Sequence, residues 1–257
     1  MNVEEYGRMY DAEEVQWWYA GMRAISLALL AEAWPDGEAA ARRILDAGCG
    51  TGNNLVHLRR FGRTIGVDLS EEALRFCRSH GVTVARGSVL SLPFAHAAFD
   101  AVTSFDVLYH RWVTDDRAAV REVARVLRPG GILLVRLPAL AMLWGAHDEA
   151  VLSRHRYTKG EVRRLLEEEG LSVERVTYAN FLLFPLILAR RTLDRLTGRR
   201  GSDVSFLPAP MEWAFRHLLA IEARLLRRLS LPLGASVFAL ARKAGRPEAG
   251  MRGLESR

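Results

Sequence analysis

The sequence predicts an α/β protein built on one seven-stranded, mostly parallel sheet with helices on both faces. From Arg42 onward, short apolar runs alternate with helix-like stretches, which is the pattern of a parallel sheet covered by helices. The 257 residues are 49% hydrophobic and 26% charged, so the chain can bury a sizeable core. At this length, one large domain with appended segments is expected.

Seven segments have the apolar character of buried strands. They are expected at about Ile44–Asp46, Thr64–Val67, Val82–Ala85, Ala101–Ser104, Ile132–Arg136, Ser172–Tyr178 and Ser236–Ala241. Helices are expected between them at about Asn53–Arg60, Glu71–His80, Asp115–Leu127 and Lys159–Glu169. Ser70 is a capping residue before the second helix, and Thr158 with Glu161 predicts a capping box before the last.

Segments outside this alternation define the other predicted units. The N-terminal segment is expected to hold one helix from about Ala12 to Trp34, and a later excursion holds a helix from Met211 to Leu229. We therefore expect an N-terminal helical cap at residues 1–40 and a core in two pieces, residues 41–179 and 233–244. A helical insertion at 180–232 separates the two pieces, and residues 245–257 form a flexible tail.

Composition excludes several classes of protein. Cys49 and Cys77 belong to no CxxC or Cys/His cluster, so reduced thiols are expected, with neither a disulfide framework nor a metal site. Met1–Ala12 has no signal-peptide character, and the longest apolar run, Phe181–Ala189, is too short to span a bilayer. A cytoplasmic protein is expected. The net charge of +6 is uneven, because residues 190–257 hold fourteen Arg/Lys against six Asp/Glu.

The strongest motif runs from Asp46 to Gly52, directly after the first predicted strand. Its glycines let the backbone turn sharply and approach a ligand closely, although such a loop alone is weak evidence. Asp68 ends the next strand, where a carboxylate can accept both hydroxyls of a ribose. Asn53 stands where a dinucleotide fingerprint has its third glycine, and no Walker lysine follows.

The run from Asp46 to Gly52 resembles motif I of the class I S-adenosylmethionine-dependent methyltransferases. The resemblance continues in the family's order over residues 42–136, through Asp68, Gly87–Phe94, Phe99–Val102, Asp106–His110 and Leu127–Gly131. It implies a Rossmann-like methyltransferase fold with an antiparallel last strand and S-adenosylmethionine as the cofactor.

Carried over by position, the resemblance implies the cofactor contacts. Gly48, Cys49 and Gly50 would line its methionine and ribose part, and Asp68 would hold the ribose hydroxyls. The adenine would meet Leu69, Ser88 and Val89, and the other side would be closed by Phe105, Asp106 and His110. Ser88 stands where the family commonly has Asp, so this contact lacks a charge. Asp46 is either an anchor of the cofactor-binding loop or a structural acceptor for loop amides, and the anchor is favoured because several loop amides need acceptors.

Titratable residues cluster in the segments expected after the fourth and fifth strands. His147, His110 and His155 are candidate general bases, with Asp148 beside His147. The same cluster could instead bind substrate without proton transfer, make structural hydrogen bonds, or hold a divalent metal, for which one pair of histidines and an Asp is thin support. The expected substrate contacts are Trp18, Tyr109, His147, Arg156 and Tyr157.

The aromatic run Trp17-Trp18-Tyr19 has two interpretations. It packs on the sheet, or it forms a lid over the cofactor with Arg23 near the cofactor carboxylate. The sequence resembles a group of bacterial methyltransferases found alongside polysaccharide and lipid-linked sugar enzymes. The shared features are a Trp-Trp element, a His-Asp followed by Arg-Tyr, and a stretch like Asn180–Pro185.

These patterns predict methyl transfer to an oxygen or nitrogen atom of a small or lipid-linked acceptor. The alternatives are C-methylation of a quinone-like acceptor and a catalytically silent cofactor-binding partner subunit. The insertion 180–232 could pack on its own domain, cover a cleft, form a homodimer face or contact the inner face of a membrane peripherally. A nucleic-acid partner is disfavoured, since the arginines form no aromatic-basic stripe.

Overall fold

The computed structural model describes residues 3–34, 41–198 and 207–245, and it contains one seven-stranded sheet of order β3-β2-β1-β4-β5-β7-β6. The strands are β1 (Arg43–Ala47), β2 (Arg63–Asp68), β3 (Thr83–Arg86), β4 (Phe99–Phe105), β5 (Leu127–Pro138), β6 (Leu171–Ala179) and β7 (Ser236–Lys243). Neighbours from β3 to β5 pair in parallel, whereas β7 runs antiparallel between β5 and β6. The predicted mostly parallel sheet with an antiparallel last strand is confirmed.

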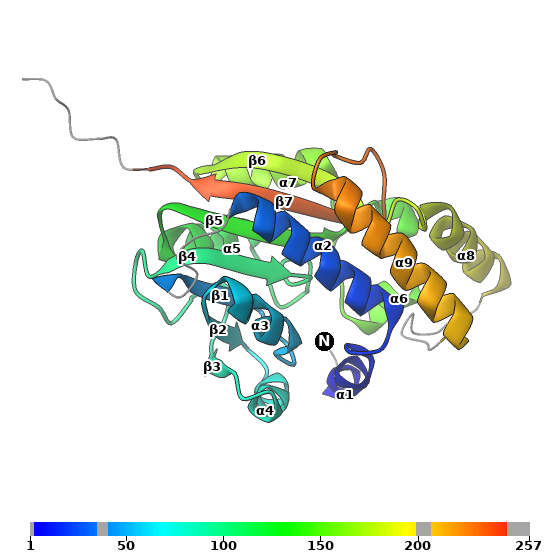
Figure 1. Ribbon diagram of the computed structural model, residues 1–257, viewed down its shortest axis with the longest axis horizontal. Coiled ribbons are helices and arrows are strands. Elements are labelled where there is room, and N and C mark those ends of the chain that lie inside the picture. The colour runs from blue at the N-terminus through cyan, green and yellow to red at the C-terminus, as the bar shows by residue number, and fades with distance from the viewer. Residues whose placement is uncertain (1–2, 35–40, 199–206, 246–257) are drawn as a thin grey trace, which may run out of the picture.

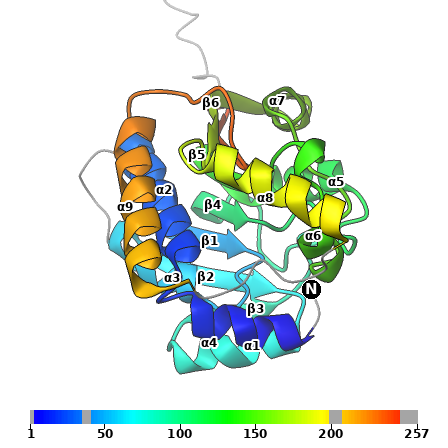
Figure 2. The ribbon, with the colours of Figure 1, turned by 90° about the vertical axis from the view of Figure 1, so that its right-hand side faces the viewer.

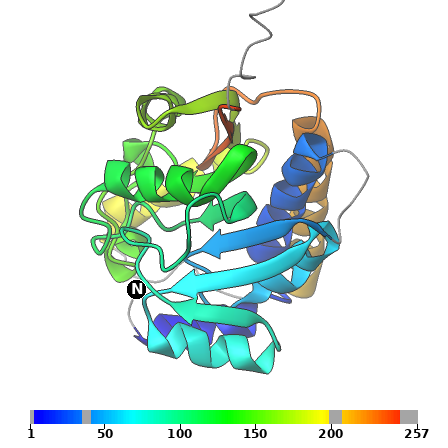
Figure 3. The same ribbon diagram turned by 90° about the vertical axis from the view of Figure 1, so that its left-hand side faces the viewer.

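Helices cover both faces of this sheet (Figures 2 and 3). α2 (Trp17–Ala33) and α9 (Ala209–Leu226) lie side by side on one face, although they are far apart in the sequence. Gly21 permits this close packing, since a Cβ there would lie 2.1 Å from Leu219 Cδ1. On the other face, α5 (Asp116–Val126) and α7 (Lys159–Glu168) bury valine and leucine side chains in the larger core.

The shorter helices between the strands begin at the caps that the sequence predicts. Ser70 Oγ accepts from the Ala73 amide at the start of α4 (Glu71–Ser79), and Thr158 with Glu161 forms a capping box before α7. The loop after β1 leads into α3 (Asn53–Leu58) and the 3-10 turn η2 (Arg59–Phe61). These caps satisfy amides that would otherwise lack partners, so they fix where each helix starts.

The prediction of a single N-terminal helix from Ala12 to Trp34 is wrong at its N-terminal end. The chain instead forms α1 (Val3–Ala12), turns, and begins α2 at Trp17 after an extended Gln16. The turn is stabilised on both sides, because Thr51 Oγ1 donates to the Glu13 carboxylate and the Trp17 amide donates to Glu212 Oε2 of α9 at 2.7 Å. The buried Glu13 side chain thus lies at the turn that interrupts the expected continuous helix.

The remaining elements lie beyond the carboxyl ends of the parallel strands (Figure 1). They are η3 (Ala141–Leu143), α6 (Ala146–Ala150) and α8 (Phe184–Thr197), together with α1. No helix in the described ranges is both long and apolar enough to cross a membrane. Of the predicted tail 245–257, all but Gly245 lies outside the described residues, as do residues 1–2 and 35–40 of the predicted cap and 199–206 of the insertion.

Candidate active site

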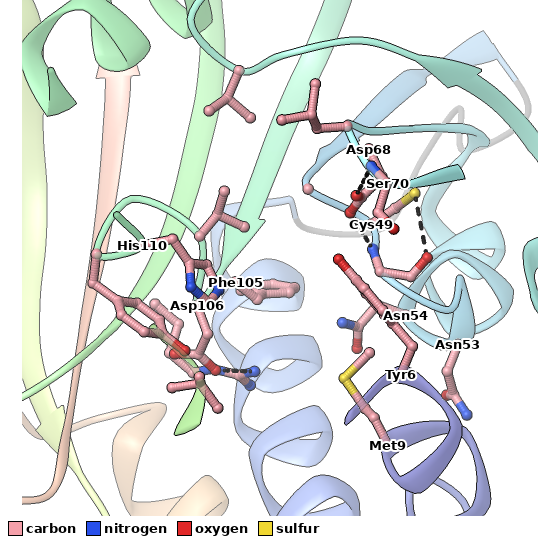
Figure 4. Close-up of a pocket in the computed structure, with 18 of the residues that line it drawn as sticks. Tyr6, Met9, Cys49, Asn53, Asn54, Asp68, Ser70, Phe105, Asp106 and His110 are labelled. Carbon is pink, nitrogen blue, oxygen red and sulfur yellow. Dashed lines mark hydrogen bonds and ion pairs between the residues drawn. The ribbon is translucent and has the colours of Figure 1, made fainter. Parts of the chain in front are cut away.

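A cavity of about 420 Å³ lies at the carboxyl edge of the parallel strands, where ligands bind in open α/β sheets. The loop after β1 and the end of β2 line one side, and the segment after β4 lines the other (Figure 4). Tyr6 and Met9 of α1 also line it, so the cavity is partly covered by the N-terminal segment.

The glycine-rich loop has a backbone that only glycine adopts easily. Gly48, Gly50 and Gly52 have φ of +85°, +54° and +88°. A Cβ at Gly48 would lie 2.3 Å from Val107 Cγ2, and one at Gly50 would lie 3.0 Å from Met9 Cε. The loop therefore presents bare backbone to the cavity, as close contact with a ligand requires.

Cys49 lines the cavity between these glycines, with 4% of its surface exposed. The neighbouring Cys77 thiol and burial raise the pKa of Cys49, so it remains a thiol. This environment suits a packing role in the loop.

Asp68, at the end of β2, holds the loop in place and lines the cavity. Its Oδ2 accepts from the Gly50 amide and its Oδ1 from the Ser70 amide, each at 2.9 Å. Burial raises the pKa of this carboxyl despite these two donors. Each oxygen keeps a further acceptor position, so Asp68 can still receive two hydroxyls of a ribose.

Asp46 does not play the expected part, because none of the loop amides donates to it. Gly48 and Cys49 donate to the Val67 carbonyl instead, at 2.8 and 3.0 Å. Asp46 is 1% exposed, accepts from Thr103 Oγ1 at 2.7 Å, and does not line the cavity. Burial raises its pKa to about 7.

The predicted adenine contacts Leu69, Ser88 and Val89 all line the cavity. Leu69 is 51% exposed, which leaves an apolar surface open to a flat ring. Ser88 Oγ accepts from the Leu90 amide at 3.2 Å, so this hydroxyl shapes its own turn.

The N-terminal segment contributes residues that sequence reasoning missed. Tyr6 and Met9 of α1 line the cavity together with Glu13, and burial raises the pKa of Tyr6 to about 12. Tyr10, on the same helix, stacks on Phe76 of α4 with ring centroids 4.8 Å apart. The spacing of Tyr6, Met9 and Tyr10 is a helical stripe, which was the available signal.

Glu13 and Arg23 connect the start of α2 to the glycine-rich loop. Burial raises the pKa of Glu13 to about 7, although Thr51 donates to it. Arg23 lines the cavity and donates to the Glu13 carbonyl at 3.0 Å and to Asn53 Oδ1 at 3.2 Å. Asn53 Nδ2 donates in turn to Glu14 Oε1 at 2.7 Å.

The aromatic run at the start of α2 divides between a contact with another helix and the wall of the cavity. Trp17 packs edge-on against Phe215 of α9, at 5.2 Å between centroids. Trp18 and Tyr19 line the cavity. The run is therefore divided between packing and the wall of the site.

The opposite wall is formed by an ion pair after β4. Asp106, with φ of +57°, accepts from Arg136 Nε at 2.8 Å. The Arg136 guanidinium also lies 5.2 Å from the ring centres of Trp18 and Phe105, within cation–π range. Sequence reasoning named Phe105, Asp106 and Trp18 but missed Arg136, whose signal is a charge at the end of an apolar strand.

Two of the three candidate histidines line the cavity. Burial lowers the pKa of His110 to about 4, and its ring stacks on Tyr109 at 4.4 Å. His147 lines the cavity from α6, and its buried Nδ1 has no hydrogen-bond partner among the described residues. His110 is thus neutral at pH 7. Its Nδ1, like that of His147, is buried without a hydrogen-bond partner among the described residues.

A second cavity of about 200 Å³ adjoins the first. The two share lining residues, among them Trp18, Asp106, Tyr109 and His147. Arg156 lines the second cavity, and its guanidinium binds both oxygens of Asp148 at 2.7 and 3.0 Å. The two cavities therefore lie next to one another, and His147 borders both.

The structure does not support His155 as a general base or Tyr157 as a substrate contact, because neither lines either cavity. His155 Nε2 lies 3.4 Å from Glu161 of α7, and its ring packs edge-on against Tyr157. Tyr157 is 2% exposed and donates to Asp116 Oδ2 at 2.9 Å. Both side chains are satisfied within the fold. Across the described residues, no three His, Cys, Asp or Glu side chains gather as a metal site would need.

Residues 45–135 match the sequence family described as "Methyltransferase domain". A Mycolicibacterium smegmatis protein named "Probable S-adenosylmethionine-dependent methyltransferase" is 34% identical over 140 residues, which are 52% of this chain and 54% of that protein. The chain thus spans about half the length of this relative.

A second relative is matched over more of its length. The ubiquinone biosynthesis O-methyltransferase of Thiobacillus denitrificans is 32% identical over 167 residues, which are 56% of this chain and 71% of that enzyme. A solved structure of a methyltransferase from Thermotoga maritima has a TM-score of 0.58 at 18% identity, covering 94% of this chain and 96% of its own, and so supports the fold. The chain belongs to the class I S-adenosylmethionine-dependent methyltransferases.

Proposed function

We propose that this chain transfers the methyl group of S-adenosylmethionine to an oxygen or nitrogen atom of a small or lipid-linked acceptor. One observation carries the proposal. The glycine-rich loop with Asp68 and the His147 side chain line one space. A methyl donor held by the loop and an acceptor beside His147 would therefore meet without crossing a barrier of protein.

The residues present fit the cofactor. Gly48 and Gly50 would bound its methionine and ribose part with backbone that carries no Cβ, and Cys49 lines the same side of the cavity. Asp68 would accept the ribose hydroxyls, and Arg23 would bind the carboxylate with guanidinium hydrogens left over from its two contacts. Leu69, Ser88 and Val89 would surround the adenine, with Phe105, Asp106 and His110 opposite.

The chain's contribution to the reaction is chiefly to position the acceptor and exclude water. When bound, S-adenosylmethionine supplies an activated methyl group. An in-line displacement then needs the acceptor atom held close and in line, which is an effect of orientation. Tyr6, Met9 and Trp18 support this role, because they line the cavity from the N-terminal segment that covers it.

His147 is the residue we assign to accept the acceptor's proton. The His147 residue borders both cavities, and its Nδ1 has no hydrogen-bond partner among the described residues. His110 is a poorer base, because burial lowers its pKa to about 4. We assign His110 and Tyr109 to positioning of the acceptor.

The release of S-adenosylhomocysteine over a panel of phenols, alcohols, amines and quinols tests the proposal. His147→Gln should lower kcat by about 10²–10⁴-fold on an oxygen or nitrogen acceptor. Binding of S-adenosylhomocysteine should be unchanged, and His96→Gln, at an exposed position outside both cavities, should behave as wild type. Binding of the cofactor without turnover of any acceptor would favour the silent partner subunit instead.

We also propose peripheral membrane contact through residues 180–232. Leu186, Leu193 and Leu196 of α8 are 52%, 59% and 80% exposed, near Arg190 and Arg195 on the same helix. Apolar side chains flanked by arginines suit a surface of anionic lipid. Co-sedimentation with phosphatidylglycerol liposomes at low salt tests this contact, and a protein that stays in the supernatant contradicts it. We also expect that the same segment can form a homodimer, which a measurement of the molar mass by light scattering tests.

A further inference from the structure

Two buried polar atoms at the second cavity have no hydrogen-bond partner among the described residues. They are Ser153 Oγ and His147 Nδ1, and both residues line this cavity. Ser153 is 1% exposed, and its backbone is fixed, because its amide donates to the Asp148 carbonyl at 2.7 Å. A buried polar atom without a partner costs free energy, which a ligand that hydrogen-bonds to it recovers. The two atoms therefore indicate a ligand with two polar groups.

The aspartates and arginines that line this cavity already have partners within the fold. Asp148 binds Arg156 through both carboxylate oxygens, and Asp106 is half of the ion pair after β4. Arg190 and Arg191 of α8 also take part in interactions within the fold. A charged ligand group would have to leave water and compete with these partners, which is costly. The cavity therefore favours an uncharged ligand.

The size and the apolar lining of the second cavity limit the shape of this ligand. Its volume is about 200 Å³, below the roughly 300–1,000 Å³ of pockets that hold drug-sized ligands. Trp18 and Tyr109 line both cavities, and Trp17, Leu143 and Ile187 add apolar surface to the second. Aromatic side chains favour flat rings, which pack on them face to face or edge-on. A sugar ring fits less well, because most of its hydroxyls would be buried without partners.

We propose that the methyl acceptor is an uncharged phenol that carries a second oxygen substituent on its ring. Its reactive hydroxyl lies beside His147, and its second oxygen pairs with Ser153 Oγ. In the transfer, the phenol oxygen bonds to the methyl carbon, the bond from that carbon to sulfur breaks with its electron pair on sulfur, and His147 Nδ1 takes the hydroxyl proton. This inference rests on the proposed methyl transfer and names the chemical class of its acceptor.

Calorimetry on the full chain saturated with S-adenosylhomocysteine tests the site. The probes are phenol and the three benzenediols, catechol, resorcinol and hydroquinone. We expect at least one benzenediol to bind at least about tenfold more tightly than phenol, because its second hydroxyl gains a buried partner. Ser153→Ala should reduce this preference to about twofold or less and leave the binding of phenol unchanged. Benzoate and benzylamine, which are charged rings of similar size, should bind less tightly than phenol.

A matched variant separates loss of the hydroxyl from general damage. Ser172→Ala, at an exposed position of β6 outside both cavities, should keep the preference for the benzenediol. The order of the probes in wild type tests the inference even if Ser153→Ala fails to fold. The inference is overturned if no benzenediol binds better than phenol, or if the preference survives in Ser153→Ala. Tighter binding of benzoate, benzylamine or methyl glucoside than of every phenol would also overturn it.

Methyl-transfer assays with the same probes separate this inference from the proposed function. Methylation of a benzenediol, with a higher KM and a similar kcat in Ser153→Ala, supports both. Methylation of an alcohol or amine by a chain that binds none of the phenols contradicts the inference alone. Failure of S-adenosylhomocysteine to bind contradicts the proposed function itself.

Discussion

At the scale of single residues, Asp68 does two things at once. Its two oxygens fix the Gly50 and Ser70 amides, and they face the proposed ribose position. Asp68→Ala should weaken binding of S-adenosylhomocysteine by roughly tenfold to a hundredfold, because one lost charge-assisted hydrogen bond is worth about 1.5–3 kcal/mol. Isothermal calorimetry measures this change. Glu72→Gln, a partly exposed acid on α4 paired with Arg75, should bind as wild type. An unchanged Kd in Asp68→Ala would contradict the assignment.

The difference between predicted and observed site residues also has a residue-scale cause. Glycines, Asp68 and Ser88 follow strands directly in the sequence, so the common edge of a parallel sheet brings them together. Asp46 and Tyr157 also sit in suggestive motifs, but their side chains turn toward Thr103 and Asp116. Motif position specifies the edge of the sheet, whereas the direction of a side chain depends on packing with residues distant in sequence.

At the scale of elements, the turn between α1 and α2 buries the Glu13 carboxyl, whose charged form is unfavourable there. Burial raises the Glu13 pKa from about 4.5 to about 7, so between these values the folded chain holds a proton that the unfolded chain lacks. Stability should therefore fall as pH rises from about 4.5 to 7, and stay lowered above 7. Glu13→Gln keeps an acceptor for Thr51 and should raise stability at pH 8 by on the order of 1–3 kcal/mol, but change little at pH 4.

Thermal unfolding of the Glu13→Gln variant and wild type at both pH values measures this difference. Glu14→Gln is the matched control, because its side chain is 60% exposed. It should show no gain at pH 8. A Tm difference between Glu13→Gln and wild type that is the same at pH 4 and pH 8 would show that Glu13 carries no buried charge.

A second element depends on one buried acid. Glu222 of α9 is 0% exposed and accepts from the Leu182 amide at 3.1 Å, just before α8 begins. Burial raises the pKa of this carboxyl, and hydrogen bonds from the backbone amides of Leu182, Phe181 and Asn180 offset part of that rise. Glu222→Ala leaves these amides without that acceptor and should cost about 1–3 kcal/mol in urea unfolding with an unchanged m value. Glu222→Gln should cost less. The exposed Glu167→Gln should be neutral, and equal losses in both Glu222 variants would argue against the hydrogen bond.

The sequence predicted elements best where the signal is local. All seven strands are present because each is a short apolar run between turns, and Ser70 and Thr158 cap the helices they precede. The break before Trp17 depends on partners at Thr51 and Glu212, which no local pattern shows. The side-by-side packing of α2 and α9 likewise depends on Gly21 meeting Leu219, almost two hundred positions away.

At the scale of the whole molecule, the cofactor should stabilise the fold unevenly. Saturation at 100 times Kd adds about 2.7 kcal/mol to the free energy of unfolding. The segment from α1 to the start of α2 should gain most locally, because Tyr6 and Met9 line the cavity and Glu13, Glu14 and Arg23 contact Thr51 and Asn53 beside the loop. The edge strand β6 does not line either cavity. Its stability should therefore rise only with the free energy of unfolding of the whole domain.

Hydrogen exchange with and without S-adenosylhomocysteine distinguishes local from global stabilisation. Amides of α1, the turn after it and the glycine-rich loop should exchange more slowly by at least about tenfold, and those of β6 by less. Asp68→Ala should lose the effect at the same ligand concentration, whereas Glu72→Gln should keep it. If the N-terminal segment showed no protection while the glycine-rich loop did, α1 would be a packed helix that takes no part in closing the site, because a lid must be held more firmly when the ligand beneath it is bound.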